Sequence, residues 1–66
     1  MDAMEVRGKV VRSETYAEGA RICFMSDDEN GTDILRVIDG VLYIYRSGKI
    51  FRISSTFDVE FCTEQI

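Results

Sequence analysis

The chain has 66 residues and a net charge of -4 at pH 7, from 12 acidic and 8 basic residues. A chain of this length forms one small domain, residues 1–66, and buries only about 60% of the surface exposed by its unfolded form, which leaves little room for a deep pocket. The acidic balance disfavours nonspecific nucleic-acid binding, which needs a concentrated positive surface. The hydrophobic fraction of 45% indicates a folded soluble protein rather than a disordered one.

The sequence also predicts a location. No stretch approaches the roughly 20 apolar residues that span a bilayer. The first ten residues, MDAMEVRGKV, lack the apolar segment of a signal peptide. We therefore expect a cytoplasmic protein. In that compartment Cys23 and Cys62 are expected to be free thiols, although two cysteines can also form one disulfide.

The first predicted element is residues 4–11, MEVRGKVV, in which apolar or small residues alternate with mostly charged ones. Met4, Val6, Gly8 and Val10 share one side of this segment. A period of two is typical of a strand with one buried face.

The next predicted strand is residues 20–25, ARICFM, which alternates in the same way. Residues 12–19, RSETYAEG, lie between the two strands and predict a polar connection. In this connection Ser13 can cap a single helical turn that ends at Gly19.

An acidic segment follows at residues 26–33, SDDENGTD. If Gly31 takes the sixth position of a helix-loop-helix calcium site, the twelfth position is Val37, so the bidentate carboxylate that such a site requires is missing. The Asn-Gly pair and its polar neighbours suit a solvated hairpin turn. We therefore expect no metal site here.

Residues 33–54 predict a three-stranded antiparallel meander. The dipeptides Asp39-Gly40 and Ser47-Gly48 divide it, because such pairs accept the positive φ angles of tight hairpin turns. The middle segment, VLYIYR, is apolar on both faces, which is typical of a central strand covered on both sides.

Residues 55–66 fit two structures. Alternation of Phe57 and Phe61 with polar residues predicts a sixth strand, which we favour, whereas Ser55 followed by Asp58 resembles the cap of a short helix. The predicted fold class is all-β: a small antiparallel sheet of five or six strands, strongly bent or closed into a barrel of the SH3 or OB type, which protects its edges. A short C-terminal helix is the alternative for the last segment.

Catalysis is not expected. The chain has no His, so the commonest general base and metal ligand is missing. A nucleophilic Cys would need a nearby base. We predict that the protein is not an enzyme and uses no cofactor or metal.

Acidic side chains are the leading candidates for a functional surface. On a strand, Asp58, Glu60 and Glu64 share one face at a spacing of roughly 6.6 Å, about twice the 3.4 Å advance of successive phosphates along one DNA strand. Such an array can imitate nucleic acid toward a basic partner. The candidate partner-binding residues are Asp27, Asp28, Glu29, Asp33, Asp58, Glu60 and Glu64.

Two other hypotheses stay open. One is a small β-barrel module that binds nucleic acid or an RNA-protein complex through basic and aromatic residues. Its candidates are Arg7, Lys9, Arg36, Arg46, Lys49 and Arg52 with Tyr43, Tyr45 and Phe51, for which alternation predicts no continuous stripe. The other is a structural subunit that assembles through a sheet edge.

In size and type the chain resembles small inhibitors encoded by phages and mobile elements, including anti-CRISPR proteins, some of which are DNA mimics. The resemblance rests on a very short acidic domain, on the stretches SDDENGTD and DVEFCTE, and on the lack of a catalytic set. It covers the whole chain in type but no residue pattern. It implies a monomeric, non-enzymatic inhibitor that occupies the basic nucleic-acid-binding site of a partner protein or complex. A net charge of -4 with six arginines is mild for a DNA mimic, so mimicry requires that the acidic residues segregate onto one face.

Overall fold

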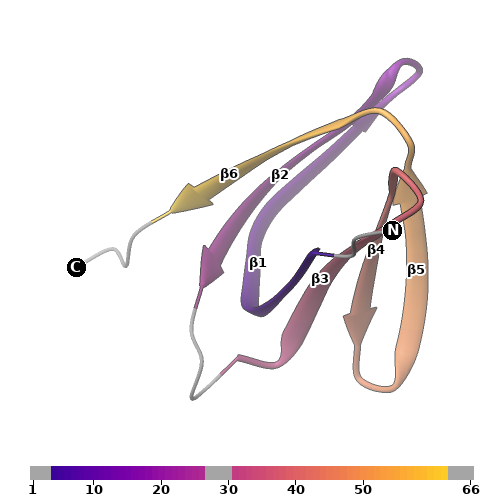
Figure 1. The fold of residues 1–66 in the computed structure, drawn as a ribbon. Helices are drawn as coiled ribbons and strands as arrows, with labels where there is room; N and C mark the ends of the chain where they lie inside the picture. Colours follow the sequence, from indigo (N-terminus) through magenta and orange to yellow (C-terminus); the bar gives the residue numbers. More distant parts are fainter. Residues whose placement is uncertain (1–3, 27–30, 63–66) are drawn as a thin grey trace.

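The computed structural model describes residues 4–26 and 31–62, which form six strands and, within those ranges, no helix (Figure 1). The strands are β1 (Met4–Tyr16), β2 (Gly19–Ser26), β3 (Asp33–Ile38), β4 (Val41–Arg46), β5 (Lys49–Ser54) and β6 (Phe57–Cys62). The predicted all-β class is confirmed, and the strand preferred for residues 55–66 is confirmed over Phe57–Cys62, whereas residues 63–66 lie outside the described residues. The described part of the chain accordingly offers no helix with the length and hydropathy of a membrane span.

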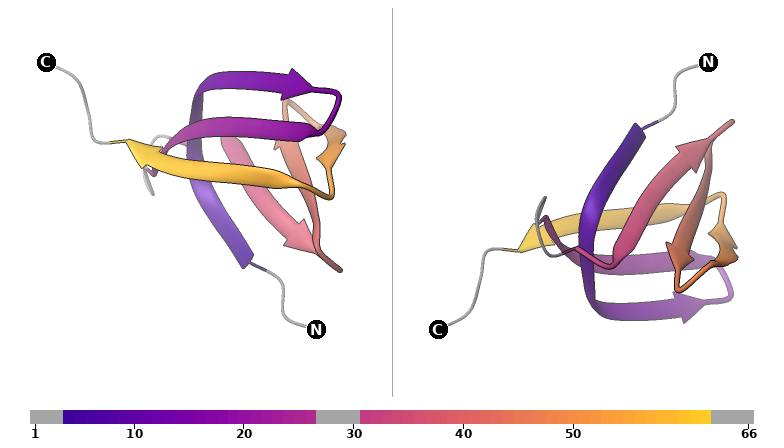
Figure 2. Two further views of the ribbon diagram at one scale, coloured as in Figure 1. Left: turned by 90° about the horizontal axis from the view of Figure 1, so that it is seen from above. Right: turned by 90° about the horizontal axis from the view of Figure 1, so that it is seen from below.

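All six strands belong to one sheet in the order β5-β4-β3-β1-β2-β6. Every neighbouring pair is antiparallel except β2 and β6, which run parallel, so the predicted antiparallel sheet is in fact mixed. The reason is that the chain crosses from β5 at one edge to β6 at the other, where the Ala20 N–H donates to the Thr56 carbonyl at 3.0 Å. Figure 2 shows β6 lying alongside β2, on the opposite side of the fold from β3.

β1 is long because it serves two neighbours. Its first half pairs with β3, from Met4 opposite Val37 to Gly8 opposite Asp33. Its second half pairs with β2 as far as Tyr16. The predicted polar connection over residues 12–19 is therefore wrong: pairing with β2 outweighs the local capping preference of its Ser and Thr, whose side chains also suit strands.

The acidic segment does not close a hairpin. β2 and β3 flank β1 on opposite sides and are not paired with each other, so the predicted hairpin at Asn30-Gly31 is wrong. Residues 27–30 lie outside the described part of the chain. The two turns of the meander are confirmed, with φ angles of 52° and 78° at Asp39 and Gly40, and of 53° and 78° at Ser47 and Gly48.

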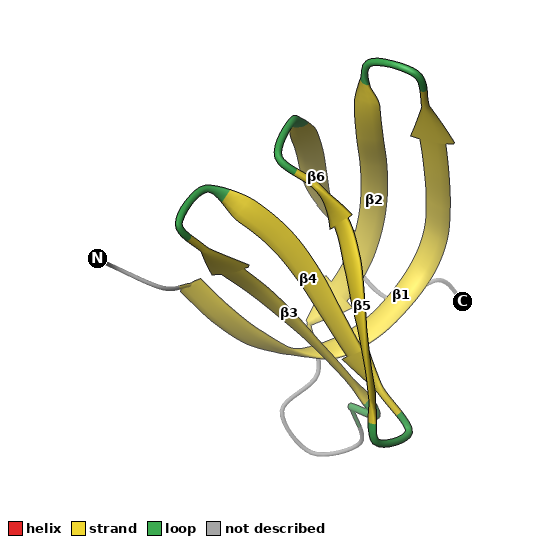
Figure 3. Cartoon of the chain, turned by 90° about the vertical axis from the view of Figure 1, so that its right-hand side faces the viewer, coloured by secondary structure: helices red, strands yellow, loops and turns green. Residues whose placement is uncertain are grey.

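β1 bends between its two halves, which lets the sheet fold over itself (Figure 3). Gly8 is the residue at which β1 passes from pairing with β3 to pairing with β2. It is buried, and a Cβ atom there would collide with the Met25 carbonyl oxygen and come within 2.7 Å of the Phe24 ring. The register then shifts between Val10 and Arg12, which leaves Val11 as the extra residue of a bulge with 54% of its surface exposed. Bulges bend the strand that carries them.

The core lies inside the folded sheet. Its buried members are Ile22, Phe24, Leu35, Leu42 and Ile44, and residues from β1, β5 and β6 pack around them. Burying each of these side chains is worth about 1.5–3 kcal/mol. β4 pairs with a strand on each side, β3 and β5, but its outward face is only half-buried. The prediction that both faces of this segment are covered is therefore wrong.

A buried carboxylate sits where β1 leaves β3. Asp33 is 1% exposed, and its two oxygens accept hydrogen bonds from the Arg46 guanidinium at 2.9 Å and from the Val10 N–H at 2.9 Å. The expectation that Asp33 belongs to an exposed partner-binding surface is therefore wrong. Asp33 is the first residue of β3, and its side chain lies on the inward side of the strand, where a buried charge requires a partner. The Arg46 hydrogen bond lowers the pKa of Asp33 and outweighs the opposing effect of burial, with help from the Val10 N–H.

Replacing Gly8 by Ala is expected to destabilise the protein by about 1–3 kcal/mol, because the added methyl group collides with the Met25 carbonyl oxygen and also crowds the Phe24 ring. Urea unfolding of the two proteins measures this difference. Val11→Ala is the control. Val11 is the exposed residue of the bulge, three positions after Gly8, and its replacement should change the free energy of unfolding by less than about 0.5 kcal/mol. Equal midpoints for wild type and Gly8→Ala would show that the bend tolerates a side chain.

Asp33→Asn is expected to lower the free energy of unfolding at pH 7 by about 2 kcal/mol. The native pKa of Asp33 lies below its ordinary value of 3.8, so the carboxylate stabilises the fold above that pH and loses this effect as the pH falls through the native pKa. The difference between wild type and variant should therefore narrow as urea unfolding is repeated toward pH 2. A difference that stays constant with pH would contradict the ion pair. The exposed Asp58→Asn serves as control.

Candidate functional site

Basic and aromatic side chains gather on one outward surface of the sheet. This surface is formed by β1, β3, β4 and β5, on the side opposite the core. We call it the Arg/Tyr face and define it by Arg7, Arg36, Tyr43, Tyr45 and Arg52. Arg7 and Arg52 are exposed, and the other three residues are half-buried.

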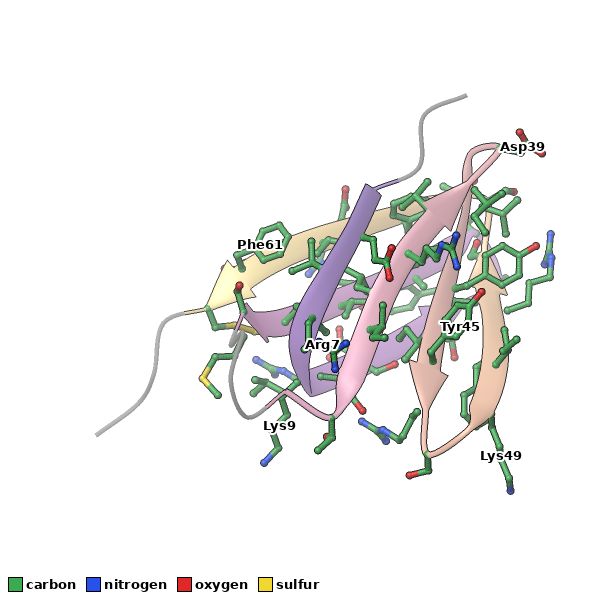
Figure 4. The ribbon with its side chains drawn as sticks, turned by 60° about the horizontal axis from the view of Figure 1, so that its bottom comes forward. Arg7, Lys9, Asp39, Tyr45, Lys49 and Phe61 are labelled. Carbon is green, nitrogen blue, oxygen red and sulfur yellow. A yellow bond between two sulfur atoms is a disulfide. The ribbon has the colours of Figure 1, made fainter. Side chains whose placement is uncertain are left out.

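Strand register orders the Arg/Tyr face in two rows across the sheet. In the first row Arg36 lies opposite Tyr43, which lies opposite Arg52. Directly opposite side chains have Cβ atoms about 4.5–5.5 Å apart, so in the first row the Tyr43 ring lies within contact distance of an arginine on each side. In the second row Ile34 separates Arg7 from Tyr45. Figure 4 looks onto this side of the sheet, with Arg7 on β1 and Tyr45 on β4 labelled.

One diagonal contact orders the middle of this face. The Arg36 guanidinium carbon lies 5.7 Å from the centroid of the Tyr45 ring, and its Nη1 donates to the Tyr45 hydroxyl at 3.4 Å. This distance is within the range of a cation–π interaction. Arg36 Nε is buried and has no hydrogen-bond partner among the described residues. The guanidinium is therefore held against the ring rather than paired with a carboxylate.

The local charge of the Arg/Tyr face is positive although the chain is acidic. Glu5, opposite Arg36, is the acidic residue of the two rows. All eight basic residues lie in the described part of the chain, whereas five of the twelve acidic residues lie outside it. These five are Asp2, Asp27, Asp28, Glu29 and Glu64. The continuous basic and aromatic surface, which alternation along single strands did not predict, arises from neighbouring strands.

The three acidic candidates that the structure describes do not form one acidic surface. Asp58 and Glu60 are exposed on β6, but Asp58 lies opposite Arg21 on β2. Glu60 shares a shallow hollow with Arg21 and with Arg12 of β1. Asp33 is buried, and the other four candidates, Asp27, Asp28, Glu29 and Glu64, lie outside the described residues. Among the described residues, the carboxylates on the outward surface of β2 and β6 therefore lie beside guanidinium groups.

A disulfide joins Cys23 of β2 to Cys62 of β6, so the prediction of free thiols is wrong. The two Cα atoms are 6.3 Å apart, a normal separation for a disulfide. Both cysteines lie on the outward sides of their strands, and the parallel register brings these sides together. The sequence indicated only that each cysteine lies on the polar side of its strand. The two are 39 positions apart in the chain, and the pairing of β2 with β6 could not be predicted from the sequence.

The described residues show no constellation for catalysis. No group of three or more Cys, Asp or Glu side chains in residues 4–26 and 31–62 is placed to hold a metal ion. Shallow hollows of about 140 to 220 Å³ lie on the surface of the described residues, below the roughly 300–1,000 Å³ of typical ligand pockets. The Tyr16 hydroxyl donates to Glu14 at 2.6 Å, which raises the pKa of Tyr16 and keeps it protonated.

Comparison with protein-family models, with curated proteins and with solved structures finds no match to this chain. The Arg/Tyr face is the surface on which four neighbouring strands bring basic and aromatic side chains together, with the Arg36–Tyr45 contact at its middle.

Reduction of the Cys23–Cys62 bond is expected to lower the free energy of unfolding by up to about 4 kcal/mol, from the loop entropy of a 39-residue separation. Urea unfolding with and without reductant measures the loss, and alkylation with mass analysis counts the thiols. The double variant Cys23→Ser/Cys62→Ser should match the reduced wild type and show no response to reductant. Equal midpoints for oxidised and reduced wild type would contradict a stabilising role for the bond.

Proposed function

We propose that this protein is a non-enzymatic module that binds single-stranded nucleic acid, free or within an RNA-protein complex, through its Arg/Tyr face. The observation that carries the proposal is the row in which Tyr43 lies between Arg36 and Arg52, with Tyr45 beside it in contact with Arg36, on an outward sheet surface. Arg7 and Arg52 are exposed on either side of the half-buried Tyr43 and Tyr45. Of the hypotheses considered, this one has the most support from the described geometry.

The chemistry of the face suits an unpaired strand. Bases of single-stranded nucleic acid stack on aromatic rings, and arginines contact the phosphates or stack in turn. Tyr43 and Tyr45 lie two positions apart on β4 and so point to the same side of the sheet. Duplex readout, by contrast, typically inserts a helix or ribbon into a groove. A sheet surface with rings at its centre supports stacking better than insertion.

The acidic-inhibitor hypothesis takes second place. It is supported by the exposed Asp58 and Glu60 on β6, where a basic, nucleic-acid-binding partner has free access. It is weakened by Arg21 beside them and by the burial of Asp33. Reversing the charge of Asp58 and Glu60 abolishes partner inhibition under this hypothesis, whereas it leaves oligonucleotide binding by the Arg/Tyr face intact under the first.

A cytoplasmic location is part of the proposal, because nucleic-acid ligands are present there. Disulfides persist mainly in oxidising compartments, so the Cys23–Cys62 bond favours such a compartment over the cytoplasm. Neither cysteine belongs to the Arg/Tyr face, whose residues lie on β1, β3, β4 and β5. The proposed binding therefore does not need the bond itself, provided that the fold persists.

The paired substitution Arg7→Ala/Arg52→Ala is expected to weaken binding to labelled single-stranded oligonucleotides by about tenfold or more, because each arginine contacts a phosphate. Fluorescence anisotropy titrations at several salt concentrations measure this. The slope of log affinity against log salt should become shallower by about 1.4, or roughly 0.7 per lost contact. The control Arg12→Ala/Arg21→Ala removes the same charge from the outward surface of the other half of the sheet, beside β2 and β6. It should change the affinity for the oligonucleotide by less than about threefold.

Variants of Tyr43 test, in the same assay, whether base stacking contributes to binding in addition to charge. Tyr43→Ala removes the ring, whereas Tyr43→Phe keeps it, so only the first should weaken binding. A double-stranded oligonucleotide and heparin are the comparison ligands, and both should bind less tightly than the single strand. If wild type does not bind single strands, or if the Arg12/Arg21 control loses as much affinity as the Arg7/Arg52 variant, the proposal is wrong.

A further inference from the structure

The sheet has two edge strands with different chemistry. β5 and β6 stand at opposite ends of the strand order, and each pairs with one neighbour among the described strands. The end of β5 and the start of β6 meet at one corner of the fold, from which the two strands diverge, as Figure 1 shows, so they do not close the sheet on each other. Two edges are therefore left with backbone groups that can pair with another strand.

The β5 edge is basic and apolar. Lys49 and Arg52 are exposed on it. Ile50 and Phe51 are also exposed, with 61% and 45% of their surface accessible. Natural edge strands are usually blunted by proline, a bulge or inward charges. β5 has no proline, but Arg52 pairs with Tyr43 and Ser54 pairs with Leu42, which leaves Ile53 in a bulge. Lys49 also lies on the inward side, opposite Arg46. The regular edge that is open to pairing is therefore residues 49–52.

The β6 edge is acidic and apolar. Asp58 and Glu60 are exposed on its outward side, and Phe61 is 52% exposed on the other side. The Phe61 ring meets Phe24 edge-on, with ring centroids 6.3 Å apart, and the disulfide ties Cys62 to β2. β6 is therefore a fixed strand and not a loose end. Figure 4 shows Phe61 and the disulfide together near the end of β6.

We propose that these edges bind a second copy of this chain, with β5 of one molecule pairing with β6 of the next. In a continuous sheet the outward sides coincide, so Arg52 of one copy lies beside Asp58 and Glu60 of the other. The inward sides also coincide and bring two exposed rings together, Phe51 and Phe61. Opposite charges and aromatic pairs both stabilise neighbouring strands.

The acidic charges disfavour symmetric pairing of β6. Two antiparallel β6 edges centred on Val59 would place Asp58 opposite Glu60, and like charges in these positions are destabilising. Lys49 and Arg52 lie on opposite sides of β5, so two β5 edges would bring like charges together only in a register that sets Arg52 against Arg52 or Lys49 against Lys49. A β5-to-β6 contact is heterologous. Each added copy therefore leaves one free edge of each kind, and assembly continues as an open row or closes as a ring.

Sedimentation velocity tests this with the oxidised, nuclease-treated full chain at increasing concentration and low salt. Wild type should increase in average mass with concentration. Lys49→Glu/Arg52→Glu and Asp58→Lys/Glu60→Lys should each stay monomeric at concentrations about tenfold above those at which wild type associates. An equimolar mixture of the two variants should associate again, because each supplies the edge that matches the other. The chain that carries all four substitutions should associate as well.

The outcomes that overturn the proposal are distinct. Wild type that stays monomeric throughout would refute it. Association that survives the β5 variant but not the β6 variant would indicate symmetric β6 pairing instead. Circular dichroism and a thiol count must first show that each variant is folded with its disulfide intact.

Nucleic-acid binding is tested separately. Arg7→Ala should reduce oligonucleotide binding without changing assembly. The Asp58/Glu60 variant should lose assembly without losing binding. Self-association and the proposed function can therefore fail independently of each other.

Discussion

The fold depends on the carboxylate of Asp33, which lies where β1 passes from one neighbour to the other. β1 pairs with β3 only as far as Gly8, and two residues later the Val10 N–H on that side donates to Asp33 instead of to a strand. Arg46 neutralises the buried charge from β4. One ion pair therefore ends a ladder, satisfies a backbone donor and links three strands. A buried carboxylate is tolerated only with such partners.

Bending β1 at this point divides the molecule into two sides with different roles. The half of the sheet that contains β3, β4 and β5 carries the Arg/Tyr face on its outward side. The half that contains β2 and β6 carries the disulfide and mixed charges on its outward side. The core lies between them, and its five buried side chains all come from β2, β3 and β4. A domain this small thus keeps two outward surfaces free because one inner surface supplies nearly all of the apolar burial.

Net charge is a poor guide to the chemistry of this surface. The chain is acidic overall, yet three of its six arginines are brought together by strands that are neighbours in space. Because salt screens charges beyond about 10 Å, a ligand on one face responds mainly to the charges of that face. The same reasoning limits the acidic candidates, since Asp58 stands beside Arg21. The position of a charge, rather than the sum of charges, decides which partners each surface can bind.

The sequence by itself determined the local features of this protein. Alternation with a period of two specified the strands, and Asp39-Gly40 and Ser47-Gly48 specified the turns, because side-chain direction and φ preference depend on adjacent residues. The extension of β1 to Tyr16 was missed because its Ser and Thr residues also suit a capped turn. Only the tertiary structure decided that β6 runs parallel to β2, that Asp33 meets Arg46, that Cys23 meets Cys62, and that arginines and tyrosines form one face. These contacts join segments far apart in the chain, and strand order is set by the packing of the whole core rather than by any local pattern.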